Sequence, residues 1–255
     1  MTAINLNADM GESYGAWHMG NDDALLRIVR SANIACGFHA GDPMHMAKTV
    51  EVAVANGVSL GAHPAFPDLQ GFGRRAMHLT AKELSATVMY QVGALQAFAV
   101  ANGTRLSHVK PHGALNNMAC ADLDMATVIV QAVRSVDQQL IVLAPASSAL
   151  VQASLDLKVR HAIEIFADRS YQDDGQLTPR AMPNAMVHGA QASVDHVLRM
   201  LDAGGIVSQR GVVLHTPIHS ICVHGDNPQA IESAASLRDA LISKGYVLVR
   251  LDEMV

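Results

Sequence analysis

The stretch that decides the fold is Asn5-Leu6-Asn7-Ala8-Asp9-Met10-Gly11-Glu12, in which polar and apolar residues alternate until a glycine interrupts them. Successive side chains of a β-strand point to opposite faces, so the polar residues up to Asp9 share one face. Polar side chains inside a core are costly unless they pair or take part in chemistry. The stretch therefore predicts a buried strand whose far end carries functional carboxylates, Asp9 and Glu12. The alternative is an internal hydrogen-bonded network without function.

Short apolar strands alternate with longer amphipathic helices along the rest of the chain. Strands are expected at residues 4–9, 31–37, 58–63, 106–110, 140–144, 162–167, 212–215, 220–224 and 246–250. Helices are expected at stretches such as residues 43–56, 81–102, 122–136 and 227–244. Asp42 before Pro43, and Thr80 with Glu83, have the spacing of helix N-caps. This alternation indicates βαβ units and a mainly parallel α/β sheet.

The choice between a closed barrel and an open, doubly wound sheet depends on where the polar residues fall. An open sheet gathers its site at one switch point, whereas a barrel builds its site from the carboxyl ends of all its strands. Polar residues recur here at the ends of many strands, which favours a (β/α) barrel. A chain of 255 residues fits one such domain, residues 1–255. Two long loops, residues 64–78 and 169–183, have the length of lids or binding loops.

Composition and charge exclude several classes of protein. Hydrophobic residues make up 50% and charged residues 16%, so the chain can bury a large core and is not disordered. A net charge of −5, 4% aromatic residues and no basic run argue against nucleic acids and anionic membranes as partners. No uninterrupted apolar run approaches the roughly 18 residues of a membrane span, and the start lacks a secretion signal. Three cysteines without a CxxC pair indicate a reduced, cytoplasmic protein.

Acidic and basic residues follow the ends of the predicted strands. Together they can polarise a carbonyl group, activate water, transfer protons and hold a carboxylate. We expect catalytic roles for Asp9, Glu12, His39, His63, Lys110 and Asp168. We expect substrate-binding roles for Arg74, Lys110, His112, Arg169 and His224. The alternation places Lys110 on a core-facing side, where a lysine must be ion-paired or bind an anion.

Two further kinds of site depend on residue type and spacing. A divalent metal accepts His and Asp ligands, and Asp9, His39 and His63 are the candidate set, although no spacing matches a signature such as H-E-x-x-H. The segment Gly71-Phe72-Gly73-Arg74-Arg75 carries two guanidinium groups that either clamp a phosphate or carboxylate or lie on a solvated turn. The sequence contains no G-x-x-x-x-G-K-[ST] loop and no G-x-G-x-x-G motif after a strand.

Six blocks of sequence are similar to those of one known family. They are residues 5–12 (NLNADMGE), 33–42 (NIACGFHAGD), 61–64 (GAHP), 71–75 (GFGRR), 109–115 (VKPHGAL) and 166–169 (FADR). The blocks run in order over essentially the whole chain, and no motif position departs from the pattern. On these residues the chain resembles the LamB/YcsF family.

The resemblance implies a fold and an activity. The fold is a distorted, seven-stranded (β/α) barrel related to the glycoside hydrolase/deacetylase barrels, so one or two of the nine predicted strands should be edge or capping pieces. The activity is the ATP-dependent hydrolytic ring opening of 5-oxoproline to L-glutamate, with ADP and phosphate as the other products. In the family it requires two partner subunits, B and C. ATP is then a co-substrate, accompanied by Mg²⁺.

Two other functions are compatible with the same residues. A stand-alone, metal-dependent deacetylase of an N-acetylated sugar would share the barrel and the Asp and His residues at the strand ends, but it would work without ATP and lose activity to a chelator. A non-catalytic protein that presents substrate to a partner enzyme would bind ligand without turnover. The sequence leaves open which subunit phosphorylates the lactam and whether copies of this chain form a homo-oligomer.

Overall fold

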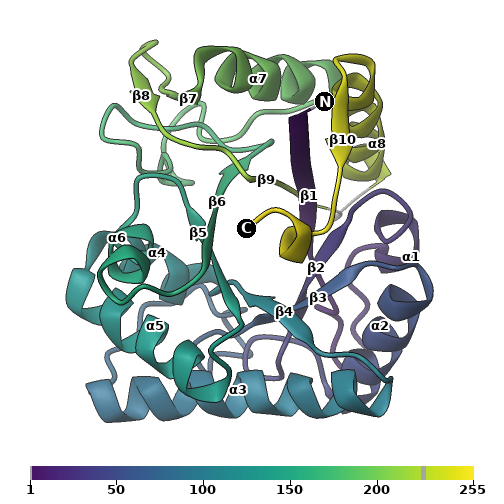
Figure 1. The fold of residues 1–255 in the computed structure, drawn as a ribbon, viewed down its shortest axis with the longest axis vertical. Coiled ribbons are helices and arrows are strands. Elements are labelled where there is room, and N and C mark those ends of the chain that lie inside the picture. Colours follow the sequence, from purple (N-terminus) through teal and green to yellow (C-terminus); the bar gives the residue numbers. More distant parts are fainter. Residues whose placement is uncertain (1, 225–227) are drawn as a thin grey trace.

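A closed barrel of parallel strands forms the centre of the molecule in the computed structural model, which describes residues 2–224 and 228–255 (Figure 1). Within those residues seven strands make up the ring, because the first strand pairs with both the second and the last. In order around the ring they are β1 (Thr2–Met10), β2 (Ser31–Ala35), β3 (Ser59–His63), β4 (Leu106–Val109), β5 (Ile141–Pro145), β6 (His161–Phe166) and β9 (Ser220–Val223). The predicted (β/α) barrel is confirmed, and the open sheet is excluded.

Three further strands in the described part of the chain lie outside the ring. β10 (Tyr246–Leu248) adds to β1 in parallel, and β7 (Gly205–Val207) forms an antiparallel hairpin with β8 (Val213–His215). The strands predicted at residues 212–215 and 246–250 therefore exist as edge pieces, as a seven-stranded ring requires. β7 was not predicted, because three residues are too few to display an alternating pattern.

Helices surround the ring. They are α1 (Asp22–Leu25), α2 (Pro43–Ala55), α3 (Ala81–Ala101), α4 (Gly113–Ala121), α5 (Leu123–Val136), α6 (Ala149–Asp156), α7 (Ala190–Ala203), α8 (Pro228–Ser243) and a C-terminal 3₁₀ turn, η1 (Leu251–Glu253). The Asp42 carboxylate caps α2, and Thr80 with Glu83 forms the predicted capping box of α3. The expected start of the last long helix, at residue 227, lies outside the described residues.

Helix α3 is an exception to the expectation that no segment has the character of a membrane span. Its 21 residues are long and apolar enough, by length and composition, to cross a bilayer. In the structure, however, Leu84, Val88, Val92 and Leu95 are buried in the main hydrophobic cluster, and the helix packs along α5. The core helices of a barrel protein pass the same test of length and hydropathy.

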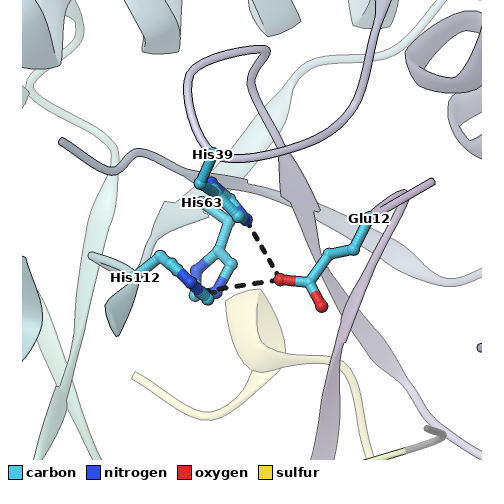
Figure 2. A group of neighbouring side chains, drawn as sticks. All are labelled: Glu12, His39, His63 and His112. Carbon is cyan, nitrogen blue, oxygen red and sulfur yellow. Dashed lines mark hydrogen bonds and ion pairs between the residues drawn. The ribbon is translucent and has the colours of Figure 1, made fainter. Parts of the chain in front are cut away.

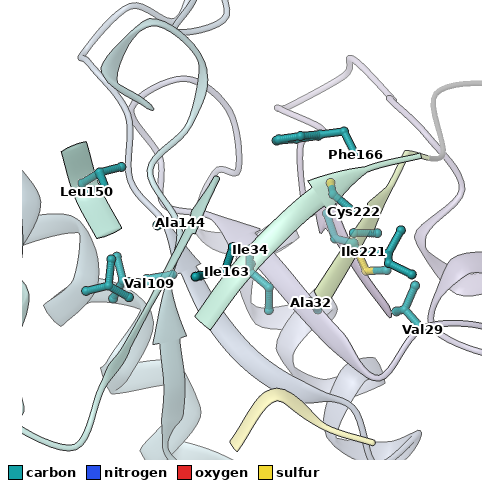
Figure 3. Close-up of a cluster of buried hydrophobic side chains, with 14 of the residues drawn as sticks. Val29, Ala32, Ile34, Val109, Ala144, Leu150, Ile163, Phe166, Ile221 and Cys222 are labelled. Carbon is teal, nitrogen blue, oxygen red and sulfur yellow. The ribbon is translucent and has the colours of Figure 1, made fainter. Parts of the chain in front are cut away.

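The hydrophobic core lies between the strands and the helices. Ile34 on β2, Val109 on β4 and Leu150 on α6 are fully buried members of this cluster (Figure 3). On β1, Leu6 and Ala8 belong to the same cluster, which leaves the alternate residues of that strand facing inward. The alternation of β1 thus separates a helix-covered apolar face from the inside of the ring.

The inside of the ring is polar at its centre. Asn7 is fully buried, and its amide donates to Glu164 at 3.2 Å. Asn33 donates to Asn7 at 2.7 Å and to Asp9 at 2.9 Å, while His108 Nε2 lies 2.8 Å from the Asn33 oxygen. This network gives the buried amide groups their partners, although one Glu164 oxygen, Oε1, has none. It also links them to Asp9 at the carboxyl ends of the strands.

The C-terminal segment closes the opposite end of the ring. Leu251 is fully buried against Ile141 and Leu143, and the Asn5 amide donates to the Val249 carbonyl at 2.8 Å. The C-terminus accordingly lies over the centre of the barrel in Figure 1. Because this end is plugged, access to the interior is left to the carboxyl ends of the strands.

Candidate active site

A cavity of about 480 Å³ lies at the carboxyl ends of the barrel strands. Eight of the ten predicted site residues line it: Asp9, Glu12, His63, Arg74, Lys110, His112, Arg169 and His224. The other two do not line the cavity but contact residues that do. His39 forms a hydrogen bond with Glu12, and Asp168 forms one with His224. Both long loops contribute to the wall, residues 64–78 through Phe72 and residues 169–183 through Tyr171. The structure therefore brings all ten predicted residues to one place.

Asp9 is the hub of the site. One carboxylate oxygen accepts from Lys110 Nζ at 3.0 Å, and the other lies 3.3 Å from His63 Nε2 and 3.8 Å from His224 Nε2. Burial raises the pKa of Asp9, but the charges of His63 and Lys110 outweigh it and hold that pKa well below the usual value. Asp9 is therefore an ionised carboxylate beside the cavity.

Lys110 lies between two carboxylates. Its Nζ is 3.0 Å from Asp9 and 3.2 Å from Glu164, and it also lies 3.1 Å from the Cys222 sulfur. Burial lowers the pKa of Lys110, but the charge of Asp9 first, and those of Cys222 and Glu164 next, raise it well above its ordinary value. The sequence left two roles open for this buried lysine, a partner in an ion pair or a binding site for an anion. The geometry favours the ion pair.

His224 and Asp168 form a half-buried pair beside Asp9. His224 Nδ1 lies 2.8 Å from the Asp168 carboxylate, which leaves Nε2 directed at Asp9. Burial lowers the pKa of His224, but Asp168 outweighs it and raises that pKa to about 9. The ring is therefore protonated at neutral pH. Asp168 contacts the cavity through this imidazole and is not itself part of the cavity wall.

Three histidines and Glu12 form a second cluster (Figure 2), which contacts Asp9 through His63. Glu12 follows β1, and His39, His63 and His112 come from the ends of β2, β3 and β4. The Glu12 carboxylate lies 3.0 Å from His39 Nε2 and 3.5 Å from His112 Nδ1, and the rings of His39 and His112 stack with centroids 3.8 Å apart. Burial lowers the pKa of both these imidazoles, so they are neutral.

The hydrogen-bond partners of the rings fix where their protons lie. His63 Nδ1 is 2.6 Å from the Lys110 carbonyl, and His112 Nε2 is 2.9 Å from the Phe72 carbonyl. A carbonyl oxygen only accepts, so these two nitrogens carry hydrogens. The remaining nitrogens, His63 Nε2 and His112 Nδ1, face each other at 3.0 Å. Two lone pairs at this distance would repel, so a proton on His63 Nε2, which also faces Asp9 at 3.3 Å, or a cation between the two nitrogens makes the approach favourable.

The donor atoms of this cluster therefore fit a divalent metal ion. One ligand atom from each of Glu12, His39, His63 and His112 lies within 4.8 Å of the others. Backbone carbonyls that hold the far ring nitrogens are the usual outer contacts of metal-bound histidines. A set of imidazoles and one carboxylate suits Zn²⁺ and similar ions. The structure thus groups His39 and His63 with Glu12 and His112, whereas Asp9 belongs to a second group with Cys222 and His224.

The two arginines of the predicted clamp have different surroundings. Arg75 forms an ion pair with Asp68 and holds the loop together. Arg74 lines the cavity, and its guanidinium carbon lies 5.0 Å from the centroid of the Phe72 ring. Of this pair, therefore, Arg74 is the residue that can reach a ligand.

Several lining or supporting residues were given no role from the sequence. Glu164 interrupts an otherwise apolar strand, and that interruption was the available signal for a buried partner of Lys110. Arg180 also lines the cavity. It stands in a loop without periodicity, so nothing in the sequence marks it.

Comparisons with known proteins show the family of this chain. Residues 4–255 match the LamB/YcsF family. The chain is 59% identical over 254 residues to a protein of Azoarcus sp. (strain BH72) that is named as the A subunit of 5-oxoprolinase, and the match covers 100% of this chain and 99% of that protein. It is 52% identical over 246 residues to the protein of the same name from Bordetella parapertussis, covering 96% of this chain and 98% of the relative.

Solved structures extend the comparison to the fold. A lactam utilization protein from Thermus thermophilus superposes with a TM-score of 0.91 and 41% identity, over 98% of this chain and 100% of the other. A family 4 carbohydrate esterase from Streptomyces lividans shares only the barrel fold, with a TM-score of 0.50 and 13% identity over 97% of this chain and 91% of that chain. From its sequence match over nearly the full length, this chain belongs to the LamB/YcsF family.

Proposed function

We propose that this chain is the ring-opening component of an ATP-dependent hydrolase that converts 5-oxo-L-proline to L-glutamate, ADP and phosphate together with partner subunits B and C. Relatives that share more than half of its residues are named as the A subunit of 5-oxoprolinase, which supports both the reaction and the need for partners. Use of ATP, and three buried free cysteines, suit a cytoplasmic protein.

The chemistry of the substrate explains the need for ATP. A five-membered lactam is an amide stabilised by resonance, so its hydrolysis at neutral pH has a high barrier. Phosphorylation of the amide oxygen makes the ring carbon electrophilic and couples ring opening to ATP. Two water molecules are consumed overall, one across the ring C–N bond and one across the phosphoryl bond. The site must therefore remove a proton from water and supply a proton to the ring nitrogen.

The observation that carries the proposal is the difference in protonation between two neighbouring side chains, Asp9 and His224. Their facing atoms are 3.8 Å apart at the cavity, yet the pKa of Asp9 is held low and that of His224 is raised to about 9. An ionised carboxylate beside a protonated imidazole is the arrangement of a general base and a general acid. We assign the base to Asp9, the acid to His224, and the positioning of that acid to Asp168.

A divalent metal would be held by Glu12, His39, His63 and His112. When bound, it would polarise the substrate oxygen and lower the pKa of water. Lys110 is then a positioning residue that keeps Asp9 ionised and directed at the cavity. Elemental analysis of the purified chain, before and after treatment with a chelator, tests for the ion independently of activity.

The experiment that tests the function is the substitution Asp9→Asn in the reconstituted assembly. The change is nearly isosteric and removes the charge, so folding and assembly should persist while glutamate formation falls at least about 100-fold. ADP and glutamate are measured together. Persistent ADP formation without glutamate assigns Asp9 to the hydrolytic step, whereas loss of both assigns it to phosphorylation or an earlier step.

An unchanged yield of both products in the Asp9→Asn assembly would reduce this chain to a scaffold and defeat the proposal. The histidine cluster specifically favours one competing activity, metal-dependent deacetylation. That activity would appear in the isolated chain without ATP and would be lost on chelation, which an acetate-release assay on N-acetylated sugars detects.

A further inference from the structure

Three arginines line the cavity that contains Asp9, and the mechanism above uses none of them. They are Arg74, Arg169 and Arg180. Among residues 2–224 and 228–255 no carboxylate forms an ion pair with any of the three, and Asp168, the neighbour of Arg169, is bound to His224. Burial first, and then the charge of Arg180, lowers the pKa of Arg169, and the nearby Asp168 only partly opposes this, so Arg169 lies close enough to Arg180 for the two charges to repel. This side of the cavity therefore carries three positive charges, and in the described part of the chain the one carboxylate near them, Asp168, is already paired with His224.

Arg169 has an unused donor inside the protein. Its side chain is only 8% exposed, and one terminal nitrogen donates to the Thr178 carbonyl at 2.7 Å. Its Nε is buried and has no partner. A buried donor without an acceptor is unfavourable, and a buried guanidinium is more so. The geometry is that of a cation that lacks its anion.

The start of α4 adds a second source of positive potential. Gly113 and Ala114, its first residues, line the cavity, and no side chain caps the helix. Arg74 lies against this helix end, with its Cγ 3.7 Å from where a Cβ on Gly113 would stand. The Ala114 N–H donates to the Gly73 carbonyl at 2.9 Å, so the N-terminus of this nine-residue helix attracts anions mainly through the partial positive charge of the helix dipole.

The amount of positive charge indicates the kind of anion. A single guanidinium is enough to bind a carboxylate by two parallel hydrogen bonds. Three guanidinium groups beside a helix N-terminus match a group with two negative charges and three terminal oxygens, which is a phosphoryl group. Asp9 and Glu12 do not neutralise the arginines, because they contact Lys110 and the histidines.

We propose that Arg74, Arg169, Arg180 and the α4 N-terminus bind the phosphoryl group of a lactam that is already phosphorylated on its amide oxygen. The substrate of this chain is then the activated intermediate and not free 5-oxoproline, an inference that rests on the proposed function. Phosphoryl transfer from ATP occurs elsewhere in the assembly, which fits the absence of a standard nucleotide loop from the sequence.

The phosphorylated lactam is an imidate phosphate, and its atoms balance through three steps. The amide oxygen takes the phosphoryl group, ADP leaves and the ring N–H proton is released. Water then adds to the ring carbon, the ring C–N bond breaks, and the proton of the new hydroxyl passes to nitrogen to give an acyl phosphate. A second water hydrolyses the acyl phosphate to glutamate and phosphate. The arginines hold the same phosphoryl group through both hydrolytic steps.

The first test measures binding of inorganic phosphate and of 5-oxoproline to the full chain by calorimetry. Phosphate should bind, and Arg169→Met should weaken its binding about tenfold or more, the effect of losing one charge-assisted contact. Arg74→Gln, at an exposed residue where folding is safe, should act in the same direction. Arg105→Gln, exposed just before β4 at the opposite end of the barrel, is the matched control and should change nothing. No phosphate binding, or an equal loss of 5-oxoproline binding, overturns the proposal.

The second test uses the assembly with partners and ATP. With Arg74→Gln or Arg169→Met, ADP should form at the wild-type rate while glutamate falls about tenfold or more, because the activated lactam escapes. An equal fall of both products would place the arginines before phosphoryl transfer and overturn the inference. A wild-type assembly that forms no glutamate would defeat the proposed function instead, since phosphate binding is measured on the chain alone.

Discussion

Lys110 illustrates how much one buried side chain controls. It is the cation shared by Asp9 and Glu164, so Lys110→Met leaves the fully buried Glu164 and the largely buried Asp9 without their common partner. Removing one partner of a buried pair costs about 3–5 kcal/mol of unfolding free energy. The pKa of Asp9 should rise as well, and glutamate formation should fall at least about thirty-fold.

Thermal unfolding and assembly turnover measure both effects of Lys110→Met. The exposed Lys48→Met is the control and should match the wild type. Adding Glu164→Gln to Lys110→Met removes the second charge and should recover part of the lost stability. If Lys110→Met neither destabilises the chain nor slows it, Lys110 has no part in the site.

The pair of His224 and Asp168 predicts how the stability and the activity of the protein depend on pH. Folding raises the pKa of His224 from its ordinary value of 6.5 to about 9, so the pair stabilises the fold fully below pH 6.5. That stability is lost as the pH rises through about 9. The variant Asp168→Asn removes the cause of the shift, so the alkaline limb of the activity profile should move toward neutral pH.

Rates of glutamate formation from pH 6 to 10 measure that limb, with unfolding midpoints over the same range. The His224→Gln variant should lose the limb altogether, because it has no proton to release. A limb that stays at the same pH in Asp168→Asn would show that another group supplies the proton.

Residue types at strand ends predicted the site, but not its internal pairing. Alternation along β1 was enough to direct Asp9 toward the interior, and barrel geometry brought His63 and Lys110 to the same end. Which nitrogen of His63 faces His112 depends on two backbone carbonyls from other loops. Such contacts depend on how loops converge, and no single sequence carries that information.

At the scale of elements, the connection from β2 to α2 is shaped by one glycine. Gly41 has a φ of +80°, and a Cβ there would lie 2.7 Å from the Ala35 carbonyl oxygen and 2.9 Å from that of Gly11. Gly41→Ala should therefore lower the unfolding temperature and displace His39, which stands two residues earlier. The metal content of the purified chain and its unfolding midpoint report the two effects.

Gly57 provides the matched control for that substitution. Its φ of +67° is similar, but a Cβ there would meet nothing within 4 Å. Gly57→Ala should cost only the backbone strain, about 1–2 kcal/mol, and leave His39 in place. Equal losses in the two variants would mean that crowding at Gly41 is unimportant.

Helix starts with a capping signal were predictable, whereas short elements were not. Thr80 and Glu83 marked α3 correctly because a capping box depends only on local spacing. α4 follows Pro111 and begins at a glycine, and both residues are equally typical of a loop. Its nine residues contain too few helical turns to show the periodicity that would distinguish a helix from a loop.

At the scale of the whole molecule, dependence on partners is the main expectation. The chain lacks a standard nucleotide loop, and an unactivated lactam resists hydrolysis. We therefore expect the isolated chain to release no measurable glutamate from 5-oxoproline, with or without ATP. Glutamate should appear only when subunits B and C and ATP are added together, and a coupled glutamate assay measures it. Turnover by the chain alone would contradict this division of labour.

The plug formed by the C-terminal segment has a consequence for how the protein is made. Asn5 and Val249, which bond across the closed end of the ring, are 244 residues apart in sequence. β1 leaves the ribosome first but obtains its partners β9 and β10 only near the end of translation. Until then the nascent chain carries an open strand edge that can pair with another chain. Production of this protein should therefore depend on chaperones that shield that edge during synthesis.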